Sequence, residues 1–113
     1  MKTLIILRPC KVGNSYKLGL YSSDFRRLAQ GQQVTSLSVQ IGEEVFDLSE
    51  SIQVYTRWGS LTNPGIASWI AANRYEDPKY LFLFELTVEN GVHTFSYLGT
   101  QKSIFQMFIK HWK

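Results

Sequence analysis

Apolar and polar residues alternate along several short stretches of this chain, which is the pattern of strands with one buried face. The clearest case is residues 34–41, where single polar residues separate Leu37, Val39 and Ile41. Residues 80–86 instead form a dense aromatic and aliphatic run that suits a buried strand. Together these patterns predict seven strands, over residues 3–8, 16–21, 34–41, 44–48, 52–58, 80–86 and 92–98.

Turn signals separate these strands. Pro9 should end the first strand, because proline cannot donate to a sheet ladder, and residues 10–15 should form a polar loop. Residues 59–63 should form a second polar loop. Asn90-Gly91 is the clearest hairpin turn, since it accepts the positive φ angles that a two-residue turn needs.

The stretch after this second loop has helical spacing. Asn63 can accept hydrogen bonds from the free N–H groups of a first helical turn, and Pro64 has no N–H to satisfy. The apolar residues that follow recur at intervals of three and four and predict one buried stripe: Ile66, Trp69 and Ile70. Asp77 and Pro78 should end this helix.

Two further helices are predicted. Ser22 or Ser23 would cap a short helix over residues 24–29, which Gly31 would stop. Residues 103–113 form the last helix, in which one face is apolar: Ile104, Phe105, Phe108, Ile109 and Trp112. We expect this terminal helix to act as a connector or to cover one end of the sheet.

Short strands that outnumber the helices predict a mainly β (α+β) fold, either an antiparallel barrel or a strongly bent sheet with helices at its open ends. The chain has 113 residues, 44% of them hydrophobic, which is enough for one core. We therefore expect residues 1–113 to form a single domain.

Charge is distributed unevenly along the chain. Residues 1–33 contain six basic residues and one acidic residue, whereas residues 34–56 contain four acidic residues and no basic one. A basic region can bind phosphates, although a solvated surface is the commoner explanation. The single Cys10 and the lack of a membrane-spanning run lead us to expect a soluble, cytoplasmic protein with no membrane partner.

Catalytic signals are weak. His93 and His111 stand apart from any metal-binding or nucleophile motif, and Cys10 lacks a positioned base. The acidic residues at 43–50 fit a solvated hairpin better than a metal centre. We predict no catalytic residue, metal or cofactor in this chain.

Two loops carry the side chains of a nucleic-acid interface, in which Arg and Asn recognise bases and Lys, Ser, Thr and Tyr hold phosphates. The first, residues 8–17, contributes Arg8, Lys11, Asn14, Ser15, Tyr16 and Lys17. The second, residues 55–63, contributes Arg57, Trp58, Ser60, Thr62 and Asn63. From composition alone, it is equally plausible that these segments are ordinary polar turns and not an interface.

The order of elements adds to this picture. The second strand (Lys-Leu-Gly-Leu-Tyr), the short helix (Ser-Asp-Phe-Arg-Arg-Leu), the later helix (Pro-Gly-Ile-Ala-Ser-Trp-Ile) and the strand Leu-Phe-Leu-Phe-Glu-Leu follow one another over residues 3–98. This order resembles the B-three DNA-binding pseudobarrel. Gly-Leu-Tyr and Arg-Trp-Gly at residues 57–59 are more similar to the effector domains of EcoRII-type restriction endonucleases than to plant B-three domains.

The resemblance implies a seven-stranded open pseudobarrel that grips double-stranded DNA with two arms, here residues 8–17 and 55–63. Arg57 and Asn14 would recognise bases in the major groove. Phosphate or mixed contacts would come from Arg8, Lys11, Ser15, Tyr16, Lys17, Ser60 and Thr62. Whether the protein takes part in an enzyme is left open, because any catalysis would lie in a separate nuclease domain or subunit. The chain departs from the family pattern by lacking a Gly before Asp77 and by its terminal helix.

Two alternatives come from other functional classes. A protein-interaction adaptor barrel would use the aromatic face of residues 103–113 as its docking surface. A small-ligand-binding barrel is compatible with the same fold, but no cluster of polar residues supports it.

Overall fold

The structure, a computed structural model, describes residues 2–13, 15–20, 33–73 and 81–100. Its strands are β1 (Lys2–Val12), β2 (Ser15–Leu20), β3 (Ser36–Ile41), β4 (Glu44–Asp47), β5 (Ser60–Leu61), β6 (Phe82–Glu89) and β7 (Val92–Thr100). Its helices are the 3-10 turn η1 (Ser49–Ser51) and the α-helices α2 (Ile52–Trp58) and α3 (Pro64–Asn73). The predicted helices over residues 24–29 and 103–113, and the helix end at Asp77 and Pro78, lie outside the described residues.

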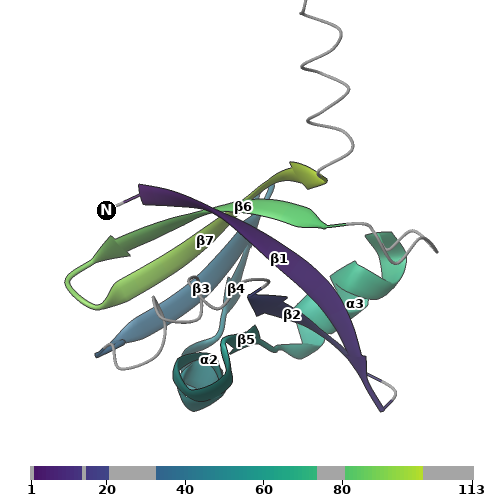
Figure 1. Cartoon of the computed structure of the whole chain (residues 1–113), viewed down its shortest axis with the longest axis horizontal. Coiled ribbons are helices and arrows are strands. Elements are labelled where there is room, and N and C mark those ends of the chain that lie inside the picture. Colours follow the sequence, from purple (N-terminus) through teal and green to yellow (C-terminus); the bar gives the residue numbers. More distant parts are fainter. Residues whose placement is uncertain (1, 14, 21–32, 74–80, 101–113) are drawn as a thin grey trace, which may run out of the picture.

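The strands form one curled sheet in the order β4-β3-β7-β6-β1-β2-β5, open on one side like a half-barrel (Figure 1). This confirms the mainly β fold with short helices in its coarse form. Every strand pair is antiparallel except β3 with β7. The exception has a local cause, because the N–H groups of Thr35 and Ser36 both donate to the carbonyl of Gly91 and so start β3 beside the start of β7.

The β6–β7 hairpin is confirmed. Glu89 pairs with Val92, and the two turn residues Asn90 and Gly91 have φ angles of 50° and 80°. The strand predicted over residues 92–98 is also confirmed, and its faces alternate, since His93 and Phe95 are buried while Val92 is exposed.

The prediction that Pro9 ends the first strand is wrong. β1 runs through Pro9 to Val12, and Pro9 pairs with Leu18 of β2. The pairing of β1 with β6 stops at Leu7, so at Pro9 the strand has a described partner on one side only. A proline is tolerated at such an edge position. The predicted loop at residues 10–15 is correspondingly short: Val12 pairs with Ser15, and Gly13, at φ 60°, begins a two-residue turn.

The predicted strand over residues 52–58 is also wrong, because these residues form α2. Ile52 and Val54 fit an alternating pattern, but Ile52 and Tyr55 also stand at a helical interval of three, and Tyr55 is buried. Gly59 ends the helix in the left-handed conformation, at φ 67°, and its N–H donates to the carbonyl of Tyr55 at 2.8 Å. The seventh strand is instead β5, inside the predicted loop.

The start of α3 is confirmed in detail. The Oδ1 of Asn63 accepts a hydrogen bond from the Gly65 N–H at 2.7 Å, and its backbone carbonyl accepts from Ala67. Its Nδ2 also donates to the carbonyl of Asp47 at 3.2 Å, which joins the helix to the end of β4. Asn63 therefore acts both as the helix cap and as a link between two elements.

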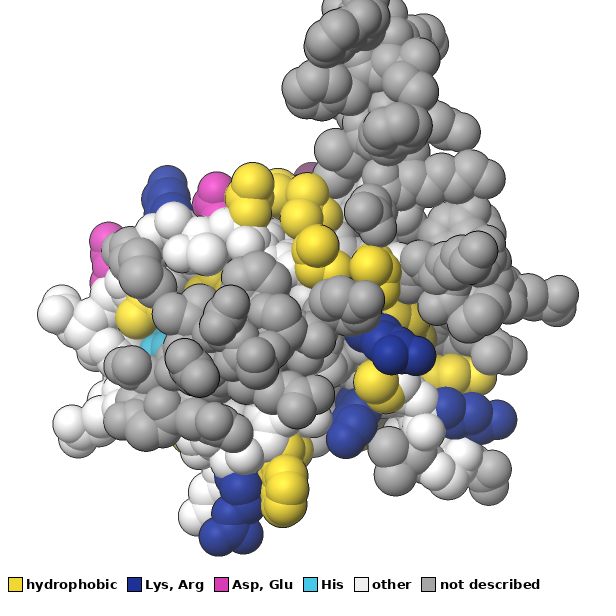
Figure 2. Space-filling view, viewed as in Figure 1, with side chains coloured by type: hydrophobic (Ala, Val, Ile, Leu, Met, Phe, Trp, Pro, Cys, Tyr) yellow, Lys and Arg dark blue, Asp and Glu magenta, His cyan; other side chains and the backbone are white. Residues whose placement is uncertain are grey.

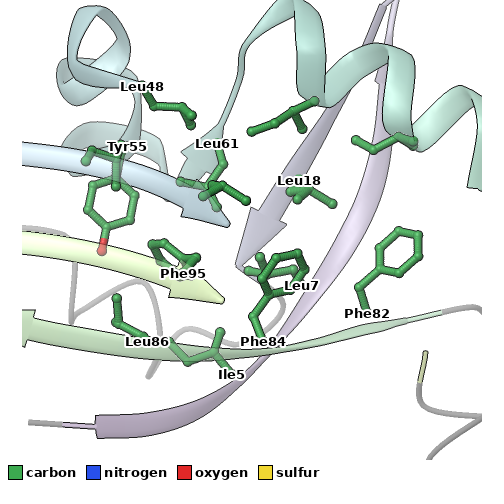
Figure 3. Close-up of a cluster of buried hydrophobic side chains, with 14 residues drawn as sticks. Ile5, Leu7, Leu18, Leu48, Tyr55, Leu61, Phe82, Phe84, Leu86 and Phe95 are labelled. Atoms are coloured by element: carbon green, nitrogen blue, oxygen red, sulfur yellow. The ribbon is translucent and has the colours of Figure 1, made fainter. Parts of the chain in front are cut away.

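One cluster of buried side chains holds these elements together (Figure 3). The inner face of the sheet supplies alternate residues of each long strand: Ile5, Leu7, Leu18, Leu37, Val39, Phe82, Phe84, Leu86 and Phe95. Ile66 and Ile70 of α3 and Tyr55 of α2 close the open side. Trp69 of α3 extends the cluster, with its ring 4.9 Å from those of Phe82 and Tyr97.

A buried polar pair lies within this cluster. The hydroxyl of Tyr55 and Nδ1 of His93 are 2.8 Å apart, and the two side chains are 0% and 1% exposed. Burial raises the pKa of Tyr55 and lowers the pKa of His93. His93 is therefore held neutral inside the core, where the hydrogen bond satisfies a ring nitrogen.

We predict that Asn63→Ala lowers the free energy of unfolding by about 1–2 kcal/mol, because both the cap and the bond to β4 are lost. Asn63→Asp should cost less, since a carboxylate still accepts from the Gly65 N–H. Urea unfolding of both variants measures this. An alanine variant as stable as the native protein would contradict the dual role of this side chain.

We also predict that stability falls with acidity through His93. Its folded pKa lies below the unfolded value of about 6.5, so below that pH the unfolded chain binds a proton that the folded chain refuses. The loss should approach at most about 1.4 kcal/mol per pH unit. Urea unfolding between about pH 7.5 and 5 should show a steeper decline for the native chain than for His93→Gln, which does not titrate. Equal slopes would contradict this assignment.

Candidate nucleic-acid interface

The first candidate segment is a two-stranded ribbon, residues 8–13 and 15–19, where β1 and β2 pair beyond the end of the β1–β6 ladder. Figure 1 shows this part of β1 and β2 reaching away from β6 and β7 at one end of the molecule. The inward side chain of Leu18 is buried against the core, and α3 lies against β2. The core thus supports the base of the ribbon while its tip extends outward.

Strand pairing divides the candidate side chains between two faces, because residues directly opposite each other share a face. Arg8 faces Gly19, and Cys10 faces Lys17, so Arg8 and Lys17 are diagonal neighbours on the outer face. Gly19 places no side chain opposite Arg8, and the Sγ of Cys10 lies 3.5 Å from the position that a Cβ of residue 19 would take. Two basic groups therefore share one side of the ribbon.

Lys11 and Tyr16 lie on the other face, as an opposed pair. The Lys11 Nζ stands 5.9 Å from the centre of the Tyr16 ring, within the range of a cation–π interaction. Tyr16 is half-buried against the core, whereas Lys11 is exposed. Ser15 is exposed near the tip, and Asn14 lies outside the described residues. The ribbon thus carries positive charge on both faces.

The second candidate segment divides into an exposed part and a buried part. Arg57 and Trp58, in the last turn of α2, are exposed, and Trp58 retains 65% of its accessible surface. Ser60 in β5 is only 4% exposed, and Thr62 is half-buried. Both ends of the Asn63 amide are engaged in hydrogen bonds within the fold. Ser60 and Asn63 therefore serve the fold, and we leave them out of the interface proposed below.

The two segments meet through β2. Gly19 pairs with Arg8 on one side and with Ser60 on the other, so the three residues form one row across β1, β2 and β5. Strand spacing places the backbones of Arg8 and Ser60 about 10 Å apart. Trp58 precedes Ser60 by two residues. The last turn of α2 thus lies two residues from the strand that pairs with β2, and the two-arm arrangement stays a prediction.

The described acidic residues lie elsewhere. Four of them lie in the β3–β4 turn, in β4 and in η1: Glu43, Glu44, Asp47 and Glu50. The other two, Glu85 and Glu89, lie in β6. Asp47 has a local role, because hydrogen bonds from the Ser49 hydroxyl and N–H lower its pKa. Figure 2 shows several dark-blue basic side chains around the β1–β2 end of this face, and magenta acidic ones toward the opposite end, where one dark-blue side chain also lies.

No group of three or more His, Cys, Asp or Glu side chains that could hold a metal ion occurs among residues 2–13, 15–20, 33–73 and 81–100. His93, the one histidine in these ranges, is enclosed in the core. No helix in the described part of the chain combines the length and the apolar character needed to cross a membrane.

Comparison of the chain with protein-family models, with curated proteins and with solved structures finds no match.

Sequence reasoning missed two features of this surface. It treated residues 8–17 as one polar loop between two strands, although they lie almost entirely on a paired ribbon that fixes which of the basic residues share a face. It also placed Arg57 and Trp58 in a strand, although they end a helix. Gly59, a residue type that commonly follows the last turn of a helix, was the available signal.

Proposed function

We propose that this protein binds double-stranded DNA by inserting the β1–β2 ribbon into the major groove, with the last turn of α2 contacting the duplex beside it. The observation that carries the proposal is the ribbon itself, which extends past the β1–β6 ladder and has basic side chains on both faces. The major groove of B-form DNA is wide enough for a two-stranded ribbon. Arg8 and Lys17 would meet the phosphates on one wall and Lys11 those on the other.

The separation of charge supports the same orientation. Four of the five described basic residues lie on the ribbon or at Arg57, the exception being Lys2 at the start of β1, while the described acidic groups lie on the β3–β4 hairpin, η1 and β6. Such a distribution attracts a polyanion to one end of the molecule and keeps it from the other. DNA approaching the ribbon would therefore meet little electrostatic repulsion.

Base recognition is assigned to Arg57. An exposed guanidinium can donate two parallel hydrogen bonds to O6 and N7 of guanine, which is the most common specific contact in the major groove. The protein would then recognise a sequence, as the resemblance to the B-three pseudobarrel implies. It would serve as the DNA-recognition part of a restriction endonuclease or as a small bacterial regulator, with any catalysis supplied by another domain or subunit.

The outer face of the sheet offers a second candidate function. Leu4 is 59% exposed and Leu98 is 48% exposed. By strand alternation they share this face with Ile6 and Leu83, which pair across β1 and β6. An apolar patch of this kind suits a protein partner, as an adaptor would need. A mass in solution that rises with concentration, without DNA binding, would favour this function over the first.

We predict that Arg8→Ala and Lys17→Ala each weaken duplex binding for all sequences and flatten the plot of log affinity against log salt by about 0.9. Lys2→Ala is the matched control, because it removes the same charge from the opposite end of β1, about 20 Å from Arg8. Fluorescence polarisation across a salt series measures both quantities. Equal effects of Arg8→Ala and Lys2→Ala would show that only net charge matters.

We predict that Arg57→Ala relaxes sequence preference at a cost of about 1–3 kcal/mol for the best site. Selection from randomised duplexes should enrich a short motif with the native chain, and one position of that motif should become degenerate with the variant. Arg57→Lys should restore salt-dependent affinity without restoring that position. An unchanged motif in Arg57→Ala would remove this residue from base recognition.

A further inference from the structure

Trp58 is the most exposed large hydrophobic side chain that the structure describes, with 65% of its surface accessible. Tryptophan is usually well buried, because its indole removes a large apolar area from water. The other described tryptophan follows this rule, since Trp69 packs against Phe82 and Tyr97. An exposed indole on this surface therefore calls for a partner that covers it.

The backbone beneath Trp58 is firmly held. Tyr55, one turn earlier, is buried and hydrogen-bonded to His93. Gly59 caps the helix through its N–H bond to the Tyr55 carbonyl, and Ser60 pairs with Gly19 of β2. The indole is thus presented from a fixed position, so little backbone entropy would be lost when a ligand covers it.

Two basic residues stand near Trp58 in the sequence and along the sheet. Arg57 directly precedes it, and Ser60, two residues later, starts the row of Ser60, Gly19 and Arg8 across β5, β2 and β1. Figure 2 shows a hydrophobic and a basic side chain protruding together at the position of α2. A flat aromatic ring beside cationic groups fits a nucleobase joined to a phosphate, since the ring stacks on the base and the cations hold the backbone.

We propose that Trp58 stacks on an unpaired nucleobase, so that the preferred ligand of this surface is a duplex with an unpaired base beside the ribbon. This inference rests on the proposed function and narrows the ligand from any DNA duplex to a duplex with an unpaired base. Inside an intact duplex both faces of each base are covered by neighbouring pairs, so away from the duplex ends an indole can stack only on a bulged or flipped base. The ribbon would hold the duplex, and Trp58 would hold the unpaired base.

The test compares an intact duplex with the same duplex carrying one unpaired 2-aminopurine. Binding is followed by polarisation of an end label, and stacking by the fall in 2-aminopurine fluorescence. The native chain should prefer the bulged duplex about 10-fold, the typical effect of one stacked base. Trp58→Ala should lose this preference and the fluorescence change, so that it binds the two duplexes equally. Trp58→Phe should retain part of both.

Leu4→Ala is the matched control, because it removes an exposed apolar side chain from a strand away from the ribbon tip and should leave the preference intact. A preference that survives in Trp58→Ala, or a native chain that binds both duplexes equally, would overturn the stacking proposal and leave duplex binding standing. Failure of the native chain to bind either duplex would overturn both proposals. Since the Trp58 side chain is largely exposed, circular dichroism should show Trp58→Ala and Trp58→Phe to be folded.

Discussion

The pairing of β1 determines how this fold is divided. Along its first half β1 is hydrogen-bonded to β6 and its inward side chains Ile5 and Leu7 are buried, whereas from Arg8 onward its only described partner is β2. The β6 ladder thus ends at Leu7. Beyond that point Leu18, opposite Pro9, is still buried in the core, and basic side chains occupy the outer face of the ribbon and, nearer its tip, also the inner face.

The position of β2 between β1 and β5 fixes where the second candidate segment lies. Because Gly19 pairs with both Arg8 and Ser60, the end of α2 is held beside the ribbon although it lies far away in the sequence. The Tyr55–His93 bond anchors α2 from below, and Asn63 ties the next helix to β4. Buried contacts therefore fix the position of exposed side chains that make no contribution to the core themselves.

Much of this fold could be predicted from local pattern. Alternation identified β3. Asn90-Gly91 identified the hairpin between β6 and β7, and Asn63-Pro64 identified the start of α3. Residues 52–58 were mistaken for a strand because Ile52 and Val54 fit an alternating pattern, while the packing of Tyr55 against His93 and Phe95 is a long-range contact that no local pattern contains. The candidate residues were named from their chemistry, but only strand register could show that Arg8 and Lys17 share a face and that Ser60 is buried.

The most direct test of the central claim is to map backbone amide shifts by nuclear magnetic resonance while short duplex DNA is added. The account predicts that the largest shifts fall in residues 8–19 and 57–59, and that residues 43–50, where the acidic side chains lie, remain unchanged. It also predicts that the shifts diminish as salt is raised, because phosphate contacts release counterions. Shifts centred on the apolar outer face around Leu4 and Leu98, or no shifts at low salt, would contradict it.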